Sequence, residues 1–258
     1  MRREPRTILA HCTLTSLPHH HSPPPTPHTQ SSDRNRKFRF LPDVEYGIAL
    51  DNLVKGCTDV LLAHPDGKRV FVGKRRVQPQ PDWWFMGGRM FPGETPIDSC
   101  VRLLKRELDL DVERSRFVPI CAQAFAFGMR EQMPKEHGTT DVQLCYLLRL
   151  RDETEASGVI LDPGEYSEGT WKSPAEILDG RYHPALKYAI GSMLAMEALE
   201  DVERCEGLGG TDEELARLTR VFLSRKRAVD GMIKGGATYD YVLDSRELDY
   251  RATVQSKY

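Results

Sequence analysis

The chain has 258 residues and a formal net charge of −2, with 40% hydrophobic and 29% charged residues. This balance is ordinary for one globular domain with extensions, or for two small domains, and gives no reason to expect a nucleic-acid partner. No apolar run approaches the roughly 18 residues that a membrane helix needs, so no membrane partner is expected. The six cysteines form no C-x-x-C pair, which argues against a structural zinc site.

Residues 1–40 are expected to be a disordered tail, because they include the run HHHSPPPTPHTQSS and have almost no aliphatic periodicity. Basic residues outnumber acidic ones there. Together with Ser, Thr and Pro, this composition is compatible with an organelle transit segment, and a solvated tail is the alternative. The sequence therefore leaves two locations open, the cytoplasm or an organelle.

Residues 41–182 are predicted to form one α/β domain. The runs DVLLAH and RVFVGKR are apolar and β-branched, and the turn between them contains Asp66-Gly67, so they predict a hairpin. The glycine-rich stretch WWFMGGRMFPGE is interpreted as a loop. Further strands are expected at FVPICAQAFAF and TDVQLCYLLRLR, joined by the polar loop GMREQMPKEHGT.

A helix is predicted directly after the glycine-rich loop. Thr95 suits the N-cap, Pro96 the first helical position and Asp98 the first turn. The apolar residues that follow have helical spacing on one face: Ile97, Cys100, Val101, Leu104 and Leu108. Ser173 and Pro174 indicate the start of a further short helix.

Residues 183–258 are predicted to be a helical extension. One helix covers KYAIGSMLAMEALEDV, and another begins with a capping-box pattern from Thr211 to Glu214. The second helix has an apolar stripe formed by Leu215, Leu218, Phe222, Val229, Met232 and Ile233. This stripe is interpreted as a packing face, either against the domain or against a second subunit in a homodimer.

The stretch GRMFPGETPIDSCVRLLKRELDL, starting at Gly88, resembles the Nudix box, G-x5-E-x7-R-E-U-x-E-E-x-G-U with U aliphatic. Six of the nine specified positions match: Gly88, Glu94, Arg102, Leu104, Glu107 and Leu110. Three depart, since Leu103 and Arg106 replace glutamates and Asp109 replaces a glycine. The resemblance covers roughly residues 57–172 and implies a Nudix-type α/β/α sandwich with a mixed β-sheet.

The pattern of losses is similar to the GDP-mannose mannosyl hydrolase branch of that superfamily, which lacks the same two glutamates. Matching elements are Gly87-Gly88-Arg89, Glu94-Thr95, Arg102-Leu103 and Glu107-Leu108. The strand Val72 to Arg75 and the element Trp83 to Arg89 also resemble that branch. Counting back from Trp171 places Glu165 and Tyr166 where the branch has a metal-binding Gln and a catalytic His.

This resemblance implies a site that binds one Mg²⁺ and a diphosphate. Carboxylates on one helical face present hard oxygens to Mg²⁺. The implied metal ligands are Gly87 through its carbonyl, Glu107 and Glu165. Arg75 and Arg89 would contact the diphosphate, since arginine matches phosphate oxygens well. Asp59 is close to the position where the branch has an acidic residue, so the resemblance implies that Asp59 contributes to substrate binding. Glu94 and Arg102 are expected to form a structural ion pair that sets the loop.

The general base is left open. Tyr166 stands at the position of the catalytic His, but tyrosine has a reference pKa of about 10 and is a poor base near neutral pH. His137, in the loop GMREQMPKEHGT, is one alternative if that loop folds over the site. Glu165 and Glu168 are two others.

The expected function is Mg²⁺-dependent hydrolysis of a nucleoside diphosphate sugar, most simply GDP-mannose, by attack of water at the anomeric carbon. One alternative is an ordinary Nudix pyrophosphohydrolase acting on another nucleoside diphosphate compound, although Leu103 and Arg106 remove metal ligands. Another is a catalytically weak nucleotide-sugar-binding or regulatory protein.

Overall fold

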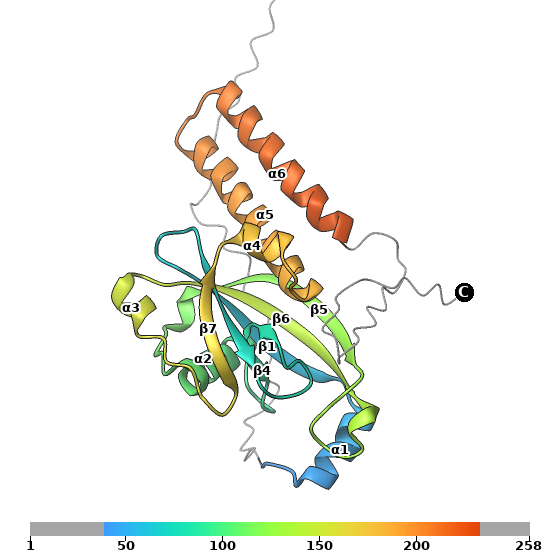
Figure 1. The fold of residues 1–258 in the computed structure, drawn as a ribbon. Coiled ribbons are helices and arrows are strands. Elements are labelled where there is room, and N and C mark those ends of the chain that lie inside the picture. Colours follow the sequence, from blue (N-terminus) through green and yellow to red (C-terminus); the bar gives the residue numbers. More distant parts are fainter. Residues whose placement is uncertain (1–38, 233–258) are drawn as a thin grey trace, which may run out of the picture.

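The computed structural model of the chain describes residues 39–232, so the predictions for residues 1–38 and for Ile233 lie outside it. At the centre is a seven-stranded sheet with the order β3-β2-β1-β6-β5, in which β4 also pairs with β1 and β7 with β2 (Figure 1). The strands are β1 (Lys55–Ala63), β2 (Val70–Arg75), β3 (Trp83–Trp84), β4 (Met86–Arg89), β5 (Phe117–Phe127), β6 (Thr139–Arg149) and β7 (Tyr166–Lys172). β1 and β6 run parallel and the other pairs antiparallel, so the sheet is mixed, as predicted.

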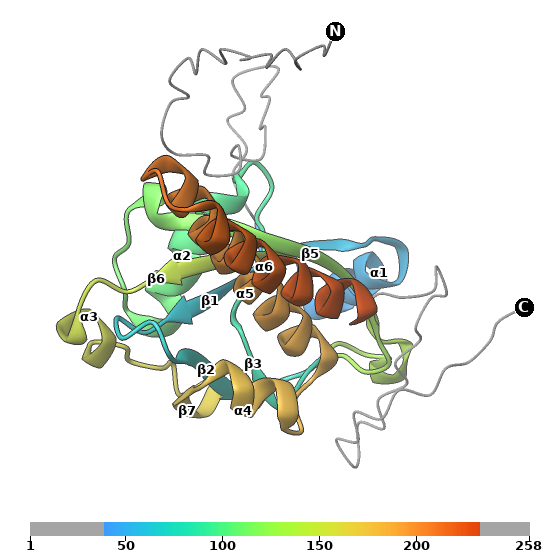
Figure 2. The ribbon, with the colours of Figure 1, turned by 90° about the horizontal axis from the view of Figure 1, so that it is seen from above.

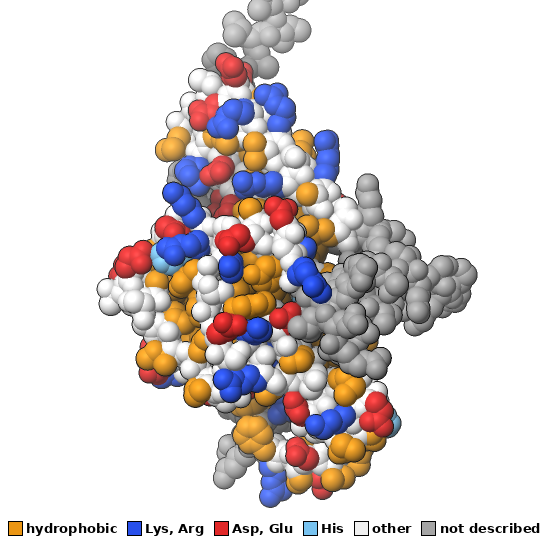
Figure 3. All heavy atoms as spheres, viewed as in Figure 1, with side chains coloured by type: hydrophobic (Ala, Val, Ile, Leu, Met, Phe, Trp, Pro, Cys, Tyr) orange, Lys and Arg blue, Asp and Glu red, His pale blue; other side chains and the backbone are white. Residues whose placement is uncertain are grey.

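Helices cover both faces of the sheet, which confirms the predicted α/β/α arrangement. The helices are α1 (Asp43–Asn52), α2 (Pro96–Leu108), α3 (Glu153–Ser157), α4 (Pro174–Asp179), α5 (Pro184–Gly207) and α6 (Asp212–Met232), with short 3-10 turns at Arg114–Arg116 and Lys135–His137. None of the helices within residues 39–232 combines the length and the apolar composition that crossing a membrane requires. On the face seen in Figure 3, acidic and basic side chains are interspersed, in keeping with the near-neutral net charge.

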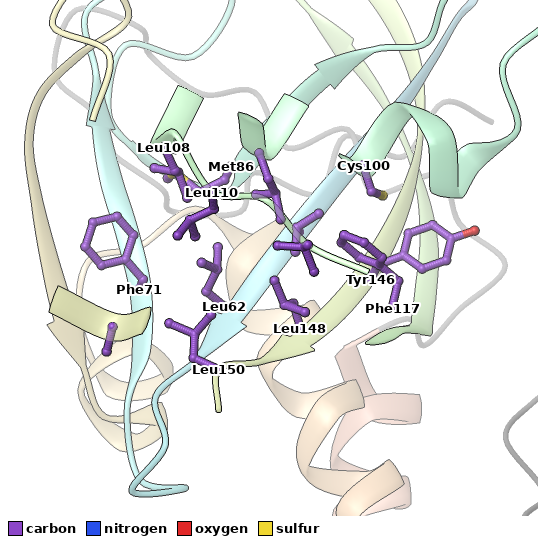
Figure 4. Packing of buried hydrophobic residues seen from close by; sticks show 14 of the residues in the cluster. Leu62, Phe71, Met86, Cys100, Leu108, Leu110, Phe117, Tyr146, Leu148 and Leu150 are labelled. Atoms are coloured by element: carbon purple, nitrogen blue, oxygen red, sulfur yellow. The ribbon is translucent and has the colours of Figure 1, made fainter. Parts of the chain in front are cut away.

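The side chains of strand β1 pack against the helices on both faces of the sheet. Val60 and Leu62 belong to the buried cluster under α2, whereas Leu61 and Ala63 belong to the cluster under α4 and α5. Successive side chains of a strand point to opposite faces of the sheet, so a strand covered on both faces needs an unbroken apolar run. Figure 4 shows the cluster on the α2 side, with side chains from the helix and the central strands meeting.

Helix α2 begins and ends as its sequence indicates. The Thr95 hydroxyl accepts the Asp98 N–H at 3.1 Å, and the Asp98 carboxylate accepts the Thr95 N–H at 3.2 Å, which completes a capping box. At its C-terminal end Asp109 has φ 52°, a left-handed conformation that glycine usually supplies. Aspartate tolerates this conformation better than most residues. The replacement of the box glycine by Asp109 therefore leaves the end of the helix intact.

The predicted hairpin is confirmed, with Leu62 opposite Phe71, but the glycine-rich loop contains more structure than expected. Strands β3 and β4 lie in it, and β4 forms because Gly88 and Gly87 pair with Thr58 and Asp59 of β1. The local glycine content suggested a loop, but this segment forms a strand because it pairs with β1, which is distant in sequence. Helices α1 and α3 were also not predicted.

The C-terminal helices lie side by side, and α6 runs along α5 (Figure 2). A Cβ on Gly191 of α5 would lie 3.1 Å from Val229 Cγ2 and 3.5 Å from Met232 Cε, so the apolar stripe of α6 packs against α5. Ala185, Leu186 and other residues in the first half of α5 belong to the buried cluster of the domain. The buried core of the domain thus includes residues after 182, the position at which the sequence predicted the domain to end. The division of the chain into domains stays a prediction.

The buried histidine at the start of α5 leads to the first testable prediction. His183 is the N-cap, its Nδ1 accepts the Ala185 N–H at 3.1 Å, and it packs edge-on against Trp84. Burial lowers the pKa of His183 from 6.5 to about 3. Between these values the unfolded chain binds a proton that the folded chain does not, so stability should fall by about 1.4 kcal/mol per pH unit below about pH 6.

The prediction is measured by urea unfolding at pH 5, 6 and 7. An His183→Asn variant keeps a capping acceptor and removes the titrating group. The difference in unfolding free energy between the wild type and this variant should shrink as the pH falls, because all carboxylates are common to both. Parallel pH curves for the two proteins would show that His183 does not cause the acid sensitivity.

Candidate active site

Strand pairing and the last turn of α2 bring the main site residues together. Arg75 ends β2 and lies opposite Tyr166, the first residue of β7. Gly87 lies in β4 opposite Asp59 of β1. Glu107 is in the last turn of α2, which packs next to β4. The site is therefore assembled from four segments that are distant in sequence.

Glu107 is the buried centre of this group, with no exposed surface. Its Oε2 accepts the Tyr166 hydroxyl at 2.6 Å and the Gly87 N–H at 2.9 Å, and its Oε1 accepts Arg106 Nη2 at 2.5 Å. Burial raises the pKa of Glu107, and the hydrogen bond from Tyr166 and the charge of Arg106 act against this rise. The three donors satisfy a carboxylate that would otherwise be costly to bury.

Arg106 and Arg75 both pair with Glu165, which links the buried carboxylate to the surface. Arg106 Nη2 lies 3.6 Å from Glu165 Oε1, and Arg75 Nη2 lies 3.5 Å from Glu165 Oε2. The side chains are 16% exposed for Arg75, 29% for Glu165 and 46% for Arg106. The result is a chain of alternating charges, Glu107–Arg106–Glu165–Arg75, that reaches solvent mainly at Arg106 and Glu165.

Asp59 lies beneath this network and is only 4% exposed. Burial raises the pKa of Asp59 to about 7, against the effects of a hydrogen bond with Gln143 and the charge of Arg75. A Cβ on Gly87 would lie 2.8 Å from Asp59 Oδ1, so the two strands are in close contact here. The structure thus places Asp59 under the site, as a support for β4.

Other predicted site residues make contacts outside this network. The guanidinium of Arg89 lies over the ring of Tyr46, 4.7 Å from its centre, and its contact with a diphosphate stays a prediction. His137 Nδ1 lies 3.1 Å from Asp51 Oδ1 at the end of α1. Glu168 pairs with Lys74 at 3.3 Å on an exposed face.

The ion pair expected between Glu94 and Arg102 is confirmed. Arg102 Nε lies 2.5 Å from Glu94 Oε1 and Nη2 lies 2.8 Å from Oε2, a bidentate arrangement. Glu94 Oε2 also accepts the Phe91 N–H at 2.7 Å, and Arg102 Nη2 donates to the Arg89 carbonyl at 3.0 Å. The pair therefore fixes the loop between β4 and α2.

The two carboxylates predicted to bind magnesium do not fit a metal ion as they are arranged here. The guanidinium of Arg106 lies between Glu107 and Glu165, and the other oxygen of Glu107 already accepts the Gly87 N–H and the Tyr166 hydroxyl. Within residues 39–232 no group of three or more His, Cys, Asp or Glu side chains is placed to hold a metal. The sequence interpretation treated Arg106 only as a lost glutamate. Its positive charge next to Glu107 was the signal that this interpretation missed.

Tyr166 is placed to hold Glu107 in position and cannot act as a base while it donates to that carboxylate. Burial and the charge of Glu107 raise the pKa of Tyr166 well above its usual value. A Tyr166→Phe variant should lose about 1–3 kcal/mol of unfolding free energy, because it leaves a buried carboxylate with one donor fewer. Any hydrolytic pH–rate profile should keep its shape. Loss of a basic limb from that profile would assign the proton transfer to Tyr166.

The chain belongs to the NUDIX family: the sequence model of the NUDIX domain matches residues 56–190, just over half of the chain. The domain described above is thus the fold of a family of hydrolases. No curated protein sequence matches the chain.

Among solved structures, a MutT NUDIX hydrolase from Burkholderia pseudomallei is 18% identical, with a TM-score of 0.42 over 54% of this chain and 97% of that one. The dihydroneopterin triphosphate pyrophosphohydrolase of E. coli is 19% identical, with a TM-score of 0.41 over 54% and 95%. The NUDIX domain of Shewanella oneidensis NrtR, solved with ADP ribose, is 15% identical, with a TM-score of 0.38 over 54% and 88%. At these identities the likeness concerns the fold alone.

Proposed function

We propose that the chain hydrolyses a nucleoside diphosphate sugar of the GDP-mannose type by attack of water at the anomeric carbon. The observation that carries this proposal is the convergence of Arg75 and Arg106 on Glu165, 3.5 and 3.6 Å away. Two guanidinium groups spaced to share one carboxylate are also spaced to share a diphosphate, which offers more oxygens of the same kind.

The charges of the site favour cleavage of the carbon–oxygen bond over attack at phosphorus. Attack at phosphorus by an activated water usually relies on metal ions held by several carboxylates. Here Leu103, which is 1% exposed, and Arg106 occupy two of the carboxylate positions of the Nudix box. Arginines, in contrast, stabilise the negative charge that develops on a departing diphosphate. The resemblance implies magnesium, but no step of the proposed reaction depends on it, and the test therefore compares Mg²⁺ with EDTA.

The proposed reaction uses Glu165 as the base. When the diphosphate takes its place between Arg75 and Arg106, the Glu165 carboxylate is released to accept a proton from water. The water oxygen forms a bond with the anomeric carbon, the bond from that carbon to the diphosphate oxygen breaks, and the nucleoside diphosphate leaves with the electron pair. The products are the nucleoside diphosphate and the free sugar with inverted configuration.

The test is incubation of the full chain with GDP-mannose, with Mg²⁺ and separately with EDTA, followed by ion-exchange chromatography. The expected products are GDP and mannose, with strongly reduced formation in Glu165→Gln and Glu107→Gln variants. Glu113→Gln is the matched control, since Glu113 is exposed and pairs with Arg151 at 2.8 Å. Release of GMP and mannose 1-phosphate would reject attack at carbon and favour an ordinary pyrophosphohydrolase.

One observation favours a second candidate, a nucleotide-sugar binder without turnover. Tyr166 stands at the position of the catalytic His of the branch, and its hydroxyl is committed to Glu107 at 2.6 Å. Such a protein would bind GDP-mannose saturably and release no product. Binding measured by calorimetry without turnover in the same preparation would select this candidate.

A further inference from the structure

We propose that the Arg106 guanidinium takes the place of the divalent cation in this site, so that the chain binds a diphosphate without any metal. The inference rests on the proposed function, because it concerns the same diphosphate. It begins from the position of Arg106 Nη2, 2.5 Å from Glu107 and 3.6 Å from Glu165. These are the two carboxylates that the family resemblance implies as metal ligands.

The ion pairs of the network balance one another. Glu107 and Glu165 contribute two negative charges, and Arg75 and Arg106 contribute two positive charges. A divalent cation is attracted by a surplus of carboxylate charge, and this linked group has none. To reach Glu107, the cation would also have to displace a guanidinium from a fully buried carboxylate, which leaves the two positive groups in mutual repulsion.

Arg106 is placed by its ion pairs with Glu107 and Glu165, and its other neighbours carry no charge that competes for them. Leu103 is on the same helical face as Glu107, one turn earlier, and supplies hydrocarbon where the Nudix box has a carboxylate. The space above Gly88 is bordered by both side chains: a Cβ on Gly88 would lie 3.6 Å from Leu103 Cδ2 and 3.8 Å from Arg106 Nη2. Arg106 thus lies beside Gly88 and Leu103 on its inner side.

The outer side of Arg106 is available to an anion. The side chain is 46% exposed, and its partner Glu165 is 29% exposed. A diphosphate that replaces Glu165 would meet Arg106 and Arg75 together, and each guanidinium offers two parallel N–H groups. The site would then bind the anion with the charge that other members of its superfamily obtain from a metal ion.

The experiment measures two kinds of binding to the full chain, with no turnover involved. Free Mn²⁺ is followed by electron paramagnetic resonance during titration with protein. Inorganic pyrophosphate binding is followed by calorimetry in EDTA. The wild type should leave Mn²⁺ free and bind pyrophosphate. An Arg106→Glu variant, which restores the residue of the Nudix box, should bind Mn²⁺ and weaken metal-free pyrophosphate binding at least tenfold, or about 1.4 kcal/mol.

Two further variants make the result specific. Arg220→Glu is the matched control, because it makes the same charge change at an exposed residue of α6, which packs against α5 and not against the site. It should behave as the wild type in both assays. Arg106→Gln should lose pyrophosphate binding without gaining Mn²⁺ binding, and it carries the test if Arg106→Glu does not fold.

Stoichiometric removal of free Mn²⁺ by the wild type, or pyrophosphate binding that disappears in EDTA, would overturn the inference. These outcomes are separate from the proposed function. A chain that binds Mn²⁺ and then hydrolyses GDP-mannose keeps the proposed function and rejects the role of Arg106. A chain that binds pyrophosphate in EDTA but releases no product keeps the role of Arg106 and rejects the hydrolysis.

Discussion

An Arg75→Gln variant should lose about a hundredfold or more in kcat/KM with GDP-mannose, because one charged donor to the departing diphosphate disappears. Arg75 is 16% exposed at the end of β2, and its guanidinium points at Glu165. Because this donor matters most as charge develops on the leaving group, kcat should fall more than KM rises.

An Arg75→Lys variant keeps the charge but loses the planar fork, so its kcat/KM should be intermediate, about tenfold below the wild type. Arg151→Gln is the control, since Arg151 is exposed and pairs with Glu113 away from the site. Steady-state kinetics of the three variants checks the prediction, with melting curves to verify folding. Unchanged kcat/KM in Arg75→Gln would remove Arg75 from the diphosphate site.

A Gly87→Ala substitution should destabilise the domain by about 3 kcal/mol, whereas Gly88→Ala should be tolerated. Both glycines lie in β4 and both have φ 159°, so backbone conformation does not distinguish them. A Cβ on Gly87 would lie 2.3 Å from the Thr58 carbonyl oxygen and 2.7 Å from the Asp59 Cα. Because both contacts are with the backbone of β1, no side chain can move to relieve them.

Gly88 has room for a methyl group, since the nearest atoms to its Cβ are Leu103 Cδ2 and Arg106 Nη2, 3.6 and 3.8 Å away. Urea unfolding of both variants measures the difference. Activity should fall with stability in Gly87→Ala, because β4 carries the N–H that Glu107 accepts. Equal unfolding free energies for the two variants would mean that β4 does not pair with β1 as described.

Local signals predicted much of the fold. The Asp66-Gly67 turn between two apolar runs predicted the β1–β2 hairpin, and Thr95 with Pro96 predicted the start of α2. Both depend on residues within one short segment. Helix α1 escaped prediction because Pro42, its N-cap, has no side chain that can cap the helix, and because the apolar residues of the helix are not gathered on one face. Val44 and Ile48 are exposed.

The site was predicted less completely because its contacts join distant segments. The sequence named Glu107, Glu165, Arg75 and Tyr166, and the structure brings these four together. It gave no sign that Arg89 would lie over Tyr46, since that contact depends on where α1 packs. The role of Arg106 follows from its distances to two carboxylates, and one of these, Glu165, reaches it only through the pairing of β7 with β2.

The central claim, attack of water at the anomeric carbon, is tested most directly with water enriched in oxygen-18. GDP-mannose is hydrolysed to completion in this water, and the products are analysed by mass spectrometry. Attack at carbon predicts that the label appears in mannose and that GDP carries none. Label in a phosphate group of GMP or mannose 1-phosphate would contradict the account, because the water would then have attacked phosphorus.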